Sequence, residues 1–466
     1  MTDVVNDDGR LLSRAQCDDI AARATRYASG GGTTDVQITS WWSGELRWAR
    51  NQIRLSSDRR NLLVTITRAI GGTRGGARTN QIDDLSIASA VQSAERVVGM
   101  APTVTPSEFE PPPPVLPVPS PRIWSDATYA ADAAIRGAVG RIVLDGVDRQ
   151  GMRSAGFLRM YASTVASAAG LMHAPGTVST YQRYTLAECS MTVRSPQGTG
   201  SGWAGESGYD WTVIDAPVLA ARALRKCLAS VDPSAVEPGR YTVVLEPQAV
   251  YALVQVVVSQ ALRQSAESGS GPFTAGFDSA VHLYRSKLGM RVADERVTIR
   301  HDPMDPRLGI VPSPGMRPVT WIDHGVLTAL ADTRGYTLVQ LNENLPDLGR
   351  SSFRMDGGTS TLDAMIAGTP RGLLVTRFAG VRLVDPSSLL CTGVSRDGIW
   401  LIENGVVTRP VKNLRFTESP LFMLNNLDAI GQAVPILSDQ RPQLSSALVP
   451  ALKARDFSFT SLVDAT

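Results

Sequence analysis

No segment limits the folds open to this chain more than the prolines between residues 102 and 121. Nine of the 29 prolines fall there, four of them consecutively from Pro111 to Pro114. Proline fixes φ and removes a backbone donor, so such a segment favours extended polyproline II and interrupts helices and sheets. It predicts a linker at 102–121, with a docking motif for an aromatic groove as the alternative interpretation.

The composition is that of a globular protein with two or three domains. Of the 466 residues, 43% are hydrophobic and 19% are charged. The net charge of +2 argues against a polyanion as the main partner, and we interpret the 42 arginines against four lysines first as codon bias. Neither the acidic first eight residues nor the interrupted apolar stretch Val250–Leu262 has the pattern of a secretion signal or a membrane span. A cytoplasmic protein is predicted, in which four cysteines form no CxxC pair: Cys17, Cys189, Cys227 and Cys391.

The first unit, residues 1–101, is expected to be an α/β domain. Ser13 is suited to cap a helix that runs to Tyr27, and a second helix is predicted from Asp83 to Val98. Three strands are expected between these helices, with a turn at Ser43-Gly44 after the first of them: Val36–Trp42, Glu45–Leu55 and Leu62–Ile70.

Two further units, a middle α+β domain at 122–235 and a strand-rich C-terminal domain at 236–466, are expected after the linker. The middle unit is predicted to hold two helices and two strands of a second sheet, with a Gly/Ser-rich hairpin or loop at 194–209. These elements are Ala127–Val143, Phe157–Ser167, Tyr184–Val193 and Pro217–Leu228. The C-terminal unit opens with a strand, Tyr241–Leu245, and a helix that begins at Pro247. Short strands follow, with tight glycine turns at His324-Gly325 and Asn404-Gly405. The predicted fold class is α+β.

Chemical motifs alone do not identify an enzyme. The four histidines, which lack the spacing of a helical zinc motif, are His173, His282, His301 and His324. There is no GxSxG elbow, and Cys391 is expected to pack in the core. The segment Gly71–Arg78 combines glycines with arginines but lacks a P-loop ending, so a flexible hairpin or a strand-to-helix loop is favoured over a phosphate or nucleic acid site. No catalytic, cofactor-binding or metal-binding residue is therefore assigned.

Three blocks in the C-terminal third resemble the TldD/PmbA family, whose members were long described as modulators of DNA gyrase and are associated with zinc-dependent peptide cleavage. They are Tyr241–Pro247 (YTVVLEP), Ile366–Phe378 (IAGTPRGLLVTRF), and Gly398–Val407 (GIWLIENGVV) with Pro410–Lys412. Weaker similarity extends over nearly the whole chain. The resemblance implies a C-terminal domain of TldD/PmbA type.

The same resemblance separates two kinds of family member. TldD-type proteins carry HExxxH on the helix after the strand at Tyr241–Leu245 and take a further zinc ligand from a Cys near the C-terminus. Here the matching segments, Glu246–Val256 and Asn425–Gln432, contain neither His nor Cys. The chain is therefore similar to the TldE (PmbA) type, which carries no zinc motif.

A TldE-like chain is expected to be a non-catalytic subunit. The resemblance implies a heterodimer with a TldD-type, zinc-bearing partner that cleaves unfolded or extended peptides, with natural-product maturation as one setting. A stand-alone hydrolase with an atypical site and a gyrase- or nucleic-acid-associated regulator are the alternatives. Neither membrane binding nor nucleic acid binding is expected. Whether the loops Gly71–Arg78 and Gln197–Tyr209 contact substrate stays open, as does a homodimer.

Overall fold

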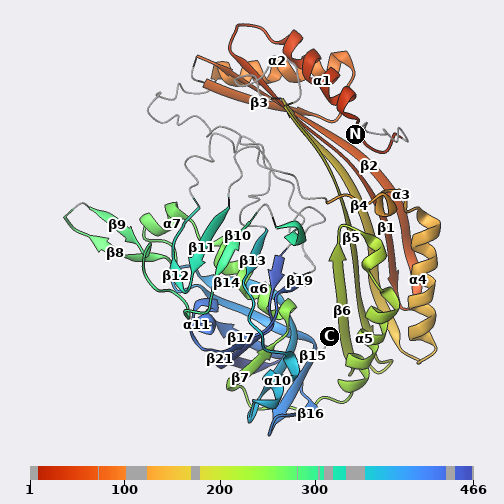
Figure 1. Ribbon diagram of the computed structural model, residues 1–466, viewed down its shortest axis with the longest axis vertical. Coiled ribbons are helices and arrows are strands. Elements are labelled where there is room, and N and C mark those ends of the chain that lie inside the picture. Colours follow the sequence, from red (N-terminus) through yellow and green to blue (C-terminus); the bar gives the residue numbers. More distant parts are fainter. Residues whose placement is uncertain are drawn as a thin grey trace.

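The computed structural model describes residues 9–71, 73–100, 123–168, 179–280, 282–302, 305–308, 318–331, 352–436 and 447–463. The predicted linker, 102–121, lies outside the described residues. A tall curved sheet stands beside a strand-rich C-terminal domain (Figure 1). The predicted α+β class is confirmed.

One antiparallel sheet of six strands contains residues from both sides of the proline-rich segment. Its order is β3-β2-β1-β4-β5-β6. The strands are β1 (Thr33–Ala49), β2 (Gln52–Ile70), β3 (Thr73–Thr79), β4 (Arg153–Ala168), β5 (Thr180–Arg194) and β6 (Ser201–Gly208). Strand β1 pairs with β4 continuously, from Val36 opposite Ala168 to Ala49 opposite Ala155. The expectation of a second sheet for 157–193 was therefore wrong, whereas the division of the chain into domains stays a prediction.

Strand β1 runs straight through Ser43-Gly44, where the sequence predicted a turn. A Cβ on Gly44 would lie 2.1 Å from Nη1 of Arg136, so this glycine permits a close approach and does not bend the chain. The turn falls at Arg50-Asn51, which both have positive φ (52° and 58°). Asn51 is suited to this conformation, and its side chain is bonded to Asp148, Met152 and Ser154.

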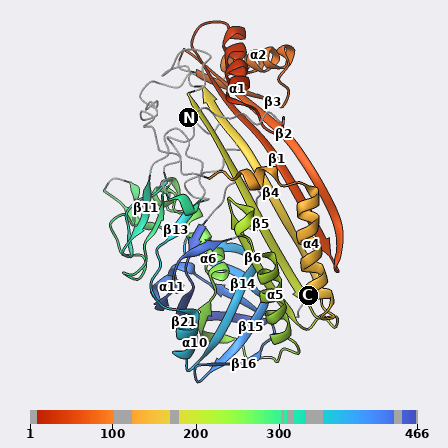
Figure 2. The same ribbon diagram turned by 45° about the vertical axis from the view of Figure 1, so that its right-hand side comes forward.

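Helices cover one face of the sheet and its ends. They are α1 (Arg14–Tyr27), α2 (Asp84–Met100), α3 (Asp126–Ala130), α4 (Ala133–Asp148) and α5 (Ala216–Ala229). Ser13 and Gln16 form the capping box of α1, which confirms the predicted cap. The single helix predicted at 127–143 is two helices, because Asp132 caps α4 by accepting from the N–H of Ile135. Figure 2 shows α4 along the side of the sheet away from the C-terminal domain.

Edge strand β3 occupies most of the segment Gly71–Arg78, which was predicted to be a flexible hairpin or a strand-to-helix loop. Gly75 lies directly beneath α2: a Cβ there would sit 2.2 Å from the carbonyl oxygen of Ala94 and 2.5 Å from the N–H nitrogen of Val98. Gly75 thus serves helix packing. Because β3 pairs with β2 from Ile70 opposite Thr73, the segment Thr73–Arg78 is one strand of a hairpin, in agreement with the hairpin alternative and not with the loop. Gly72 lies outside the described residues.

Gly75→Ala is expected to lower the melting temperature by several degrees, corresponding to about 1–3 kcal/mol from forced separation of β3 and α2. Gly76→Ala is the matched control, because its Cβ would meet nothing closer than 3.8 Å. That substitution is expected to be neutral or slightly stabilising, since alanine restricts the unfolded chain. Thermal unfolding by circular dichroism makes the comparison, and equal melting temperatures would contradict the packing role.

The C-terminal domain has two sheets. A seven-stranded sheet has the order β14-β7-β21-β17-β15-β16, with β18 paired to β21, and a six-stranded sheet has the order β12-β11-β10-β13-β20-β19. The first comprises β7 (Gly239–Leu245), β14 (Arg371–Asp385), β15 (Leu390–Glu403), β16 (Val406–Pro410), β17 (Leu414–Glu418), β18 (Leu427–Ile430) and β21 (Leu452–Leu462). The second comprises β10 (Ile299–His301), β11 (Val319–Asp323), β12 (Val326–Leu327), β13 (Phe353–Met355), β19 (Val434–Ile436) and β20 (Ala447–Val449).

The remaining elements are short, apart from α6. A two-stranded hairpin, β8 (Thr274–Asp278) and β9 (Leu283–Ser286), extends from the domain, as Figure 1 shows. The helices are α6 (Pro247–Ser259), α7 (Arg263–Glu267), α10 (Leu362–Ala367) and α11 (Pro420–Asn425), with 3-10 turns at Trp211–Val213 and Pro306–Leu308. Both predicted glycine turns are confirmed: His324-Gly325 and Asn404-Gly405 have positive φ between paired strands.

Candidate functional site

Helix α6, which the sequence resemblance matched to the zinc-motif segment of TldD-type proteins, is an apolar core helix. Pro247 begins it, and six of its side chains are at most 2% exposed within the core of the C-terminal domain: Ala249, Val250, Leu253, Val254, Val257 and Val258. Valine, leucine and alanine offer no electron pair to a metal, so zinc does not fit this donor set. Across the described residues, no group of three or more His, Cys, Asp and Glu could hold a metal ion.

At the start of this helix, Glu246 is paired with a cation. Nζ of Lys226 donates to Oε2 and Oε1 of Glu246 at 2.6 and 2.8 Å and lies 3.4 Å from the hydroxyl of Thr376. Lys226 belongs to α5, and Thr376 belongs to β14. The pair therefore joins the helical cover of the N-terminal sheet to the C-terminal domain.

The histidines and cysteines do not assemble into a site. His301 is buried and has its Nδ1 2.9 Å from the carbonyl oxygen of Ser352, and burial lowers its pKa. His282 and His324 are exposed, and His173 lies outside the described residues. Cys391 packs in the core, as predicted, and burial raises the pKa of its thiol to about 11, far from that of a reactive thiolate.

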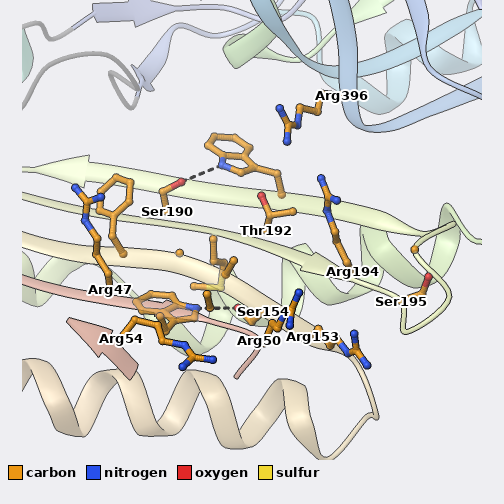
Figure 3. A pocket seen from close by; sticks show the side chains of 18 of the residues that line it. Arg47, Arg50, Arg54, Arg153, Ser154, Ser190, Thr192, Arg194, Ser195 and Arg396 are labelled. Atoms are coloured by element: carbon orange, nitrogen blue, oxygen red, sulfur yellow. Dashed lines mark hydrogen bonds between the residues drawn. The ribbon is translucent and has the colours of Figure 1, made fainter. Parts of the chain in front are cut away.

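A cavity of about 930 Å³ lies between the N-terminal sheet and the C-terminal domain. We call it the arginine cavity, because eight of its lining residues are arginines: Arg47, Arg50, Arg54, Arg153, Arg159, Arg194, Arg377 and Arg396. No Asp or Glu stands among the described residues that line it. Figure 3 shows the labelled arginines arranged around this space, with Arg396 reaching it from the opposite wall.

Two lining residues in the floor of the arginine cavity, Arg47 and Arg159, belong to an ion-pair ladder across three strands. Glu45 on β1, Arg159 on β4 and Glu188 on β5 are direct cross-strand neighbours. Arg159 donates to Glu45 and to Glu188, each at 3.0 Å, and Arg47 donates to Glu45 at 2.8 Å. Burial alone would raise the pKa of Glu45, but the hydrogen bonds and charges of Arg47 and Arg159 outweigh it and hold that pKa below its ordinary value.

The wall of the cavity on the C-terminal side is fixed by Asp397. This carboxylate is 1% exposed, and it accepts from Nε of Arg377 at 2.6 Å and from the hydroxyl of Ser201 at 2.6 Å. The Arg377 guanidinium lies 5.0 Å from the ring centroid of Trp203. Because Ser201 and Trp203 are on β6, these contacts tie the edge of the N-terminal sheet to β14 and β15. Within the segment Gln197–Tyr209, residues Ser201–Gly208 form β6, and Gly198 and Trp203 line the cavity.

The arginines at the rim of the cavity differ from those of the floor and wall in their exposure and in their bonding. Arg50, Arg54 and Arg153 are exposed, and none of them makes a hydrogen bond or an ion pair with the described residues. Arg153 stands directly opposite Arg194 in the β4–β5 ladder. Like charges at directly opposed positions tend to destabilise a sheet.

Sequence reasoning did not predict the arginine cavity. Its residues come from separate strands that only the sheet register brings together, and the arginine excess was interpreted as codon bias. The usable signal was the clustering of arginines at 47–54 and 153–159. These two segments become neighbours once β1 pairs with β4.

Comparison with known proteins places the fold. Residues 238–461 match the family described as the PmbA/TldA metallopeptidase C-terminal domain. Over the whole chain, the fold is similar to that of TldE from Thermococcus kodakarensis, with 14% identity, a TM-score of 0.73, and 96% of this chain and 100% of that chain covered.

Two further solved structures have a similar fold, and both are described as candidate modulators of DNA gyrase. The one from Bacteroides thetaiotaomicron has 17% identity, a TM-score of 0.73, and coverage of 96% and 98% of the two chains. The one from Thermotoga maritima has 13% identity, a TM-score of 0.74, and coverage of 96% and 99%. No curated protein matches the chain in sequence. Among the described helices, none combines the length and apolar character needed to cross a membrane.

Proposed function

We propose that this chain, whose residues 238–461 match the PmbA/TldA metallopeptidase C-terminal domain, is the TldE-type, non-catalytic subunit of a metallopeptidase complex that processes unfolded or extended peptides. The observation that carries the proposal is the composition of α6. An apolar helix stands where TldD-type members need two His and a Glu, so zinc and the general base would come from a TldD-type partner.

The second support is the arginine cavity. It is large enough for a ligand and lies between the two halves of the chain, where a peptide could be held next to a partner's active site. A subunit that binds substrate without cleaving it needs such a surface and no catalytic residue. The proposal includes modified peptides of natural-product maturation, because a binding surface of this kind can accept an extended chain without a folded structure.

The proposed compartment is the cytoplasm. Cys17, Cys189, Cys227 and Cys391 are all free and buried. Unpaired thiols are usual in reducing compartments and rare in secreted proteins. Their burial also keeps them protonated, so no redox role is assigned to them.

Zinc content and casein cleavage test this function on the purified chain alone, on a TldD-type protein encoded beside it, and on the two after co-expression. We expect stoichiometric zinc and cleavage in the co-purified complex. The chain alone is expected to hold no zinc and to cleave no substrate. Zinc bound by this chain alone, or casein cleavage without the partner, would refute the proposal and favour a stand-alone hydrolase.

A further inference from the structure

We propose that the arginine cavity selects acidic peptides, by binding a stretch of an extended chain that is rich in Asp and Glu. This inference rests on the proposed function, since it names the substrate class of a peptide-processing subunit. Three observations lead to it: the opposed arginines of β4 and β5, the position of Arg50, and the way in which the carboxylates near the cavity are already bonded.

The first observation is the charge conflict between Arg153 and Arg194. The two residues are direct neighbours across β4 and β5, a pairing of like charges that tends to destabilise a sheet. Arg153 is exposed and has no hydrogen bond or ion pair with the described residues. A ligand carboxylate bonded to Arg153 from the cavity would add a charge-assisted attraction beside this opposed pair.

The second observation is the hairpin that holds Arg50. Arg50 has a φ of 52°, a conformation that costs an arginine about 1 kcal/mol. Asn51, the next residue, is tied by its side chain to Asp148, Met152 and Ser154, so the turn is rigid. Arg50 therefore reaches the rim from a fixed backbone, together with Arg54 on β2.

The third observation is that the carboxylates near the cavity are already bonded to other arginines. Glu45 and Glu188 are bonded to Arg159 in the floor, and Asp397 is bonded to Arg377 in the wall. None of them lines the cavity. The rim arginines consequently face space in which no described carboxylate neutralises them, and a ligand has to supply the negative charge.

A peptide fits this cavity better than a nucleic acid does. Base recognition in single strands requires aromatic faces that are open for stacking. Here Trp48 and Trp203 are only 3% and 6% exposed, and their ring N–H groups donate to Ser154 and Ser190. The ring of Phe157 has the Arg159 guanidinium 4.9 Å from its centroid. With a net charge of +2, the chain also lacks the overall basicity of a polyanion-binding protein.

The test compares two triple variants that remove the same charge. Arg50→Gln/Arg54→Gln/Arg153→Gln neutralises the rim. Arg141→Gln/Arg222→Gln/Arg382→Gln is the matched control, because these three arginines are also exposed and make no hydrogen bond or ion pair with the described residues but do not line the cavity. The probes are a fluorescein-labelled peptide of alternating Glu and Gly, its Gln/Gly counterpart, and labelled single-stranded DNA.

Fluorescence anisotropy on the chain alone is expected to show binding of the Glu/Gly peptide and not of the Gln/Gly peptide. Salt should weaken that binding, and the rim variant should weaken it about tenfold, with no effect of the control variant. Equal losses in both triple variants, no loss in the rim variant, or equal binding of the two peptides would overturn the inference. Single-stranded DNA that binds more tightly than the Glu/Gly peptide, and is lost in the rim variant, would also overturn it in favour of nucleic acid.

One further measurement, and the absence of the partner from the binding assay, make the result interpretable. Arg153→Gln alone should melt at the wild-type temperature or above it, because it relieves the repulsion with Arg194. A lower melting temperature would show that Arg153 is structural and would contradict its assignment to ligand binding. Because binding is measured without the TldD-type partner, failure of the complex to cleave casein and failure of the chain to bind acidic peptide are separate results.

Discussion

Arg377→Met is expected to lower the free energy of unfolding by about 3–5 kcal/mol, because it leaves a buried carboxylate without its cation. Asp397 is 1% exposed, and Arg377 donates to it at 2.6 Å. Methionine keeps much of the length and apolar volume of arginine, so the loss of stability reflects removal of the positive charge. Urea denaturation followed by circular dichroism and tryptophan fluorescence measures it.

Arg396→Met is the control for this prediction. Arg396 stands next to Asp397 in sequence and has its Nε 3.9 Å from the same carboxylate oxygen, but its side chain is 46% exposed. A solvent-exposed ion pair contributes about 0–1 kcal/mol, so this variant should be nearly neutral. Adding Asp397→Asn to the Arg377→Met variant should recover part of the stability, since asparagine tolerates the positive φ of 57° and carries no charge. Equal losses from Arg377→Met and Arg396→Met would contradict the role of burial.

The second large effect is expected for Arg159→Met, which should lower the free energy of unfolding by about 3–5 kcal/mol near neutral pH. Arg159 bonds to both Glu45 and Glu188, whose side chains are 11% and 3% exposed. Arg47→Met is its control, because Arg47 bonds to the same oxygen of Glu45 but is 54% exposed. A loss no larger for Arg159→Met than for Arg47→Met would refute the ladder as a stabilising element.

The difference in unfolding free energy between wild type and Arg159→Met should depend on pH in a definite direction. The pKa of Glu45 in the folded protein is below its ordinary value near 4.5. The stabilisation that this lowered pKa represents is present above 4.5 and is lost as the pH falls through the folded pKa. The free-energy gap between wild type and Arg159→Met should therefore narrow when the pH is lowered below 4.5. Urea denaturation across that range measures the gap, and a constant gap would exclude Glu45 as its source.

Local elements of the fold could be predicted from the sequence because their signals lie within a few residues. The capping box at Ser13 begins α1, Pro247 begins α6, and the glycines at 325 and 405 supply the positive φ of two turns. These features depend on propensity and capping, which act at short range.

Features that depend on distant pairing could not be predicted. Gly44 was interpreted as a turn residue because its contact, the side chain of Arg136, belongs to a helix about ninety residues away. Gly75 was assigned to a flexible hairpin or loop for the same reason, since only the approach of α2 explains it. The arginine cavity needs the register of β1, β4 and β5 together, and the sequence carries no local signal for that register.

The pairing of β1 with β4 has a consequence for how the protein is made. Strand β1 is hydrogen-bonded on one side to β2 and on the other side to β4, which lies beyond the proline-rich segment. A nascent chain that has been synthesised only as far as residue 100 therefore displays an unpaired strand edge along the full length of β1. Such an edge is a template for pairing with other chains, so we expect an aggregation risk that ends when β4 pairs with β1. For the same reason, we expect the segments before and after the proline-rich segment, expressed separately, to associate through β1 and β4 in a fragment-complementation experiment.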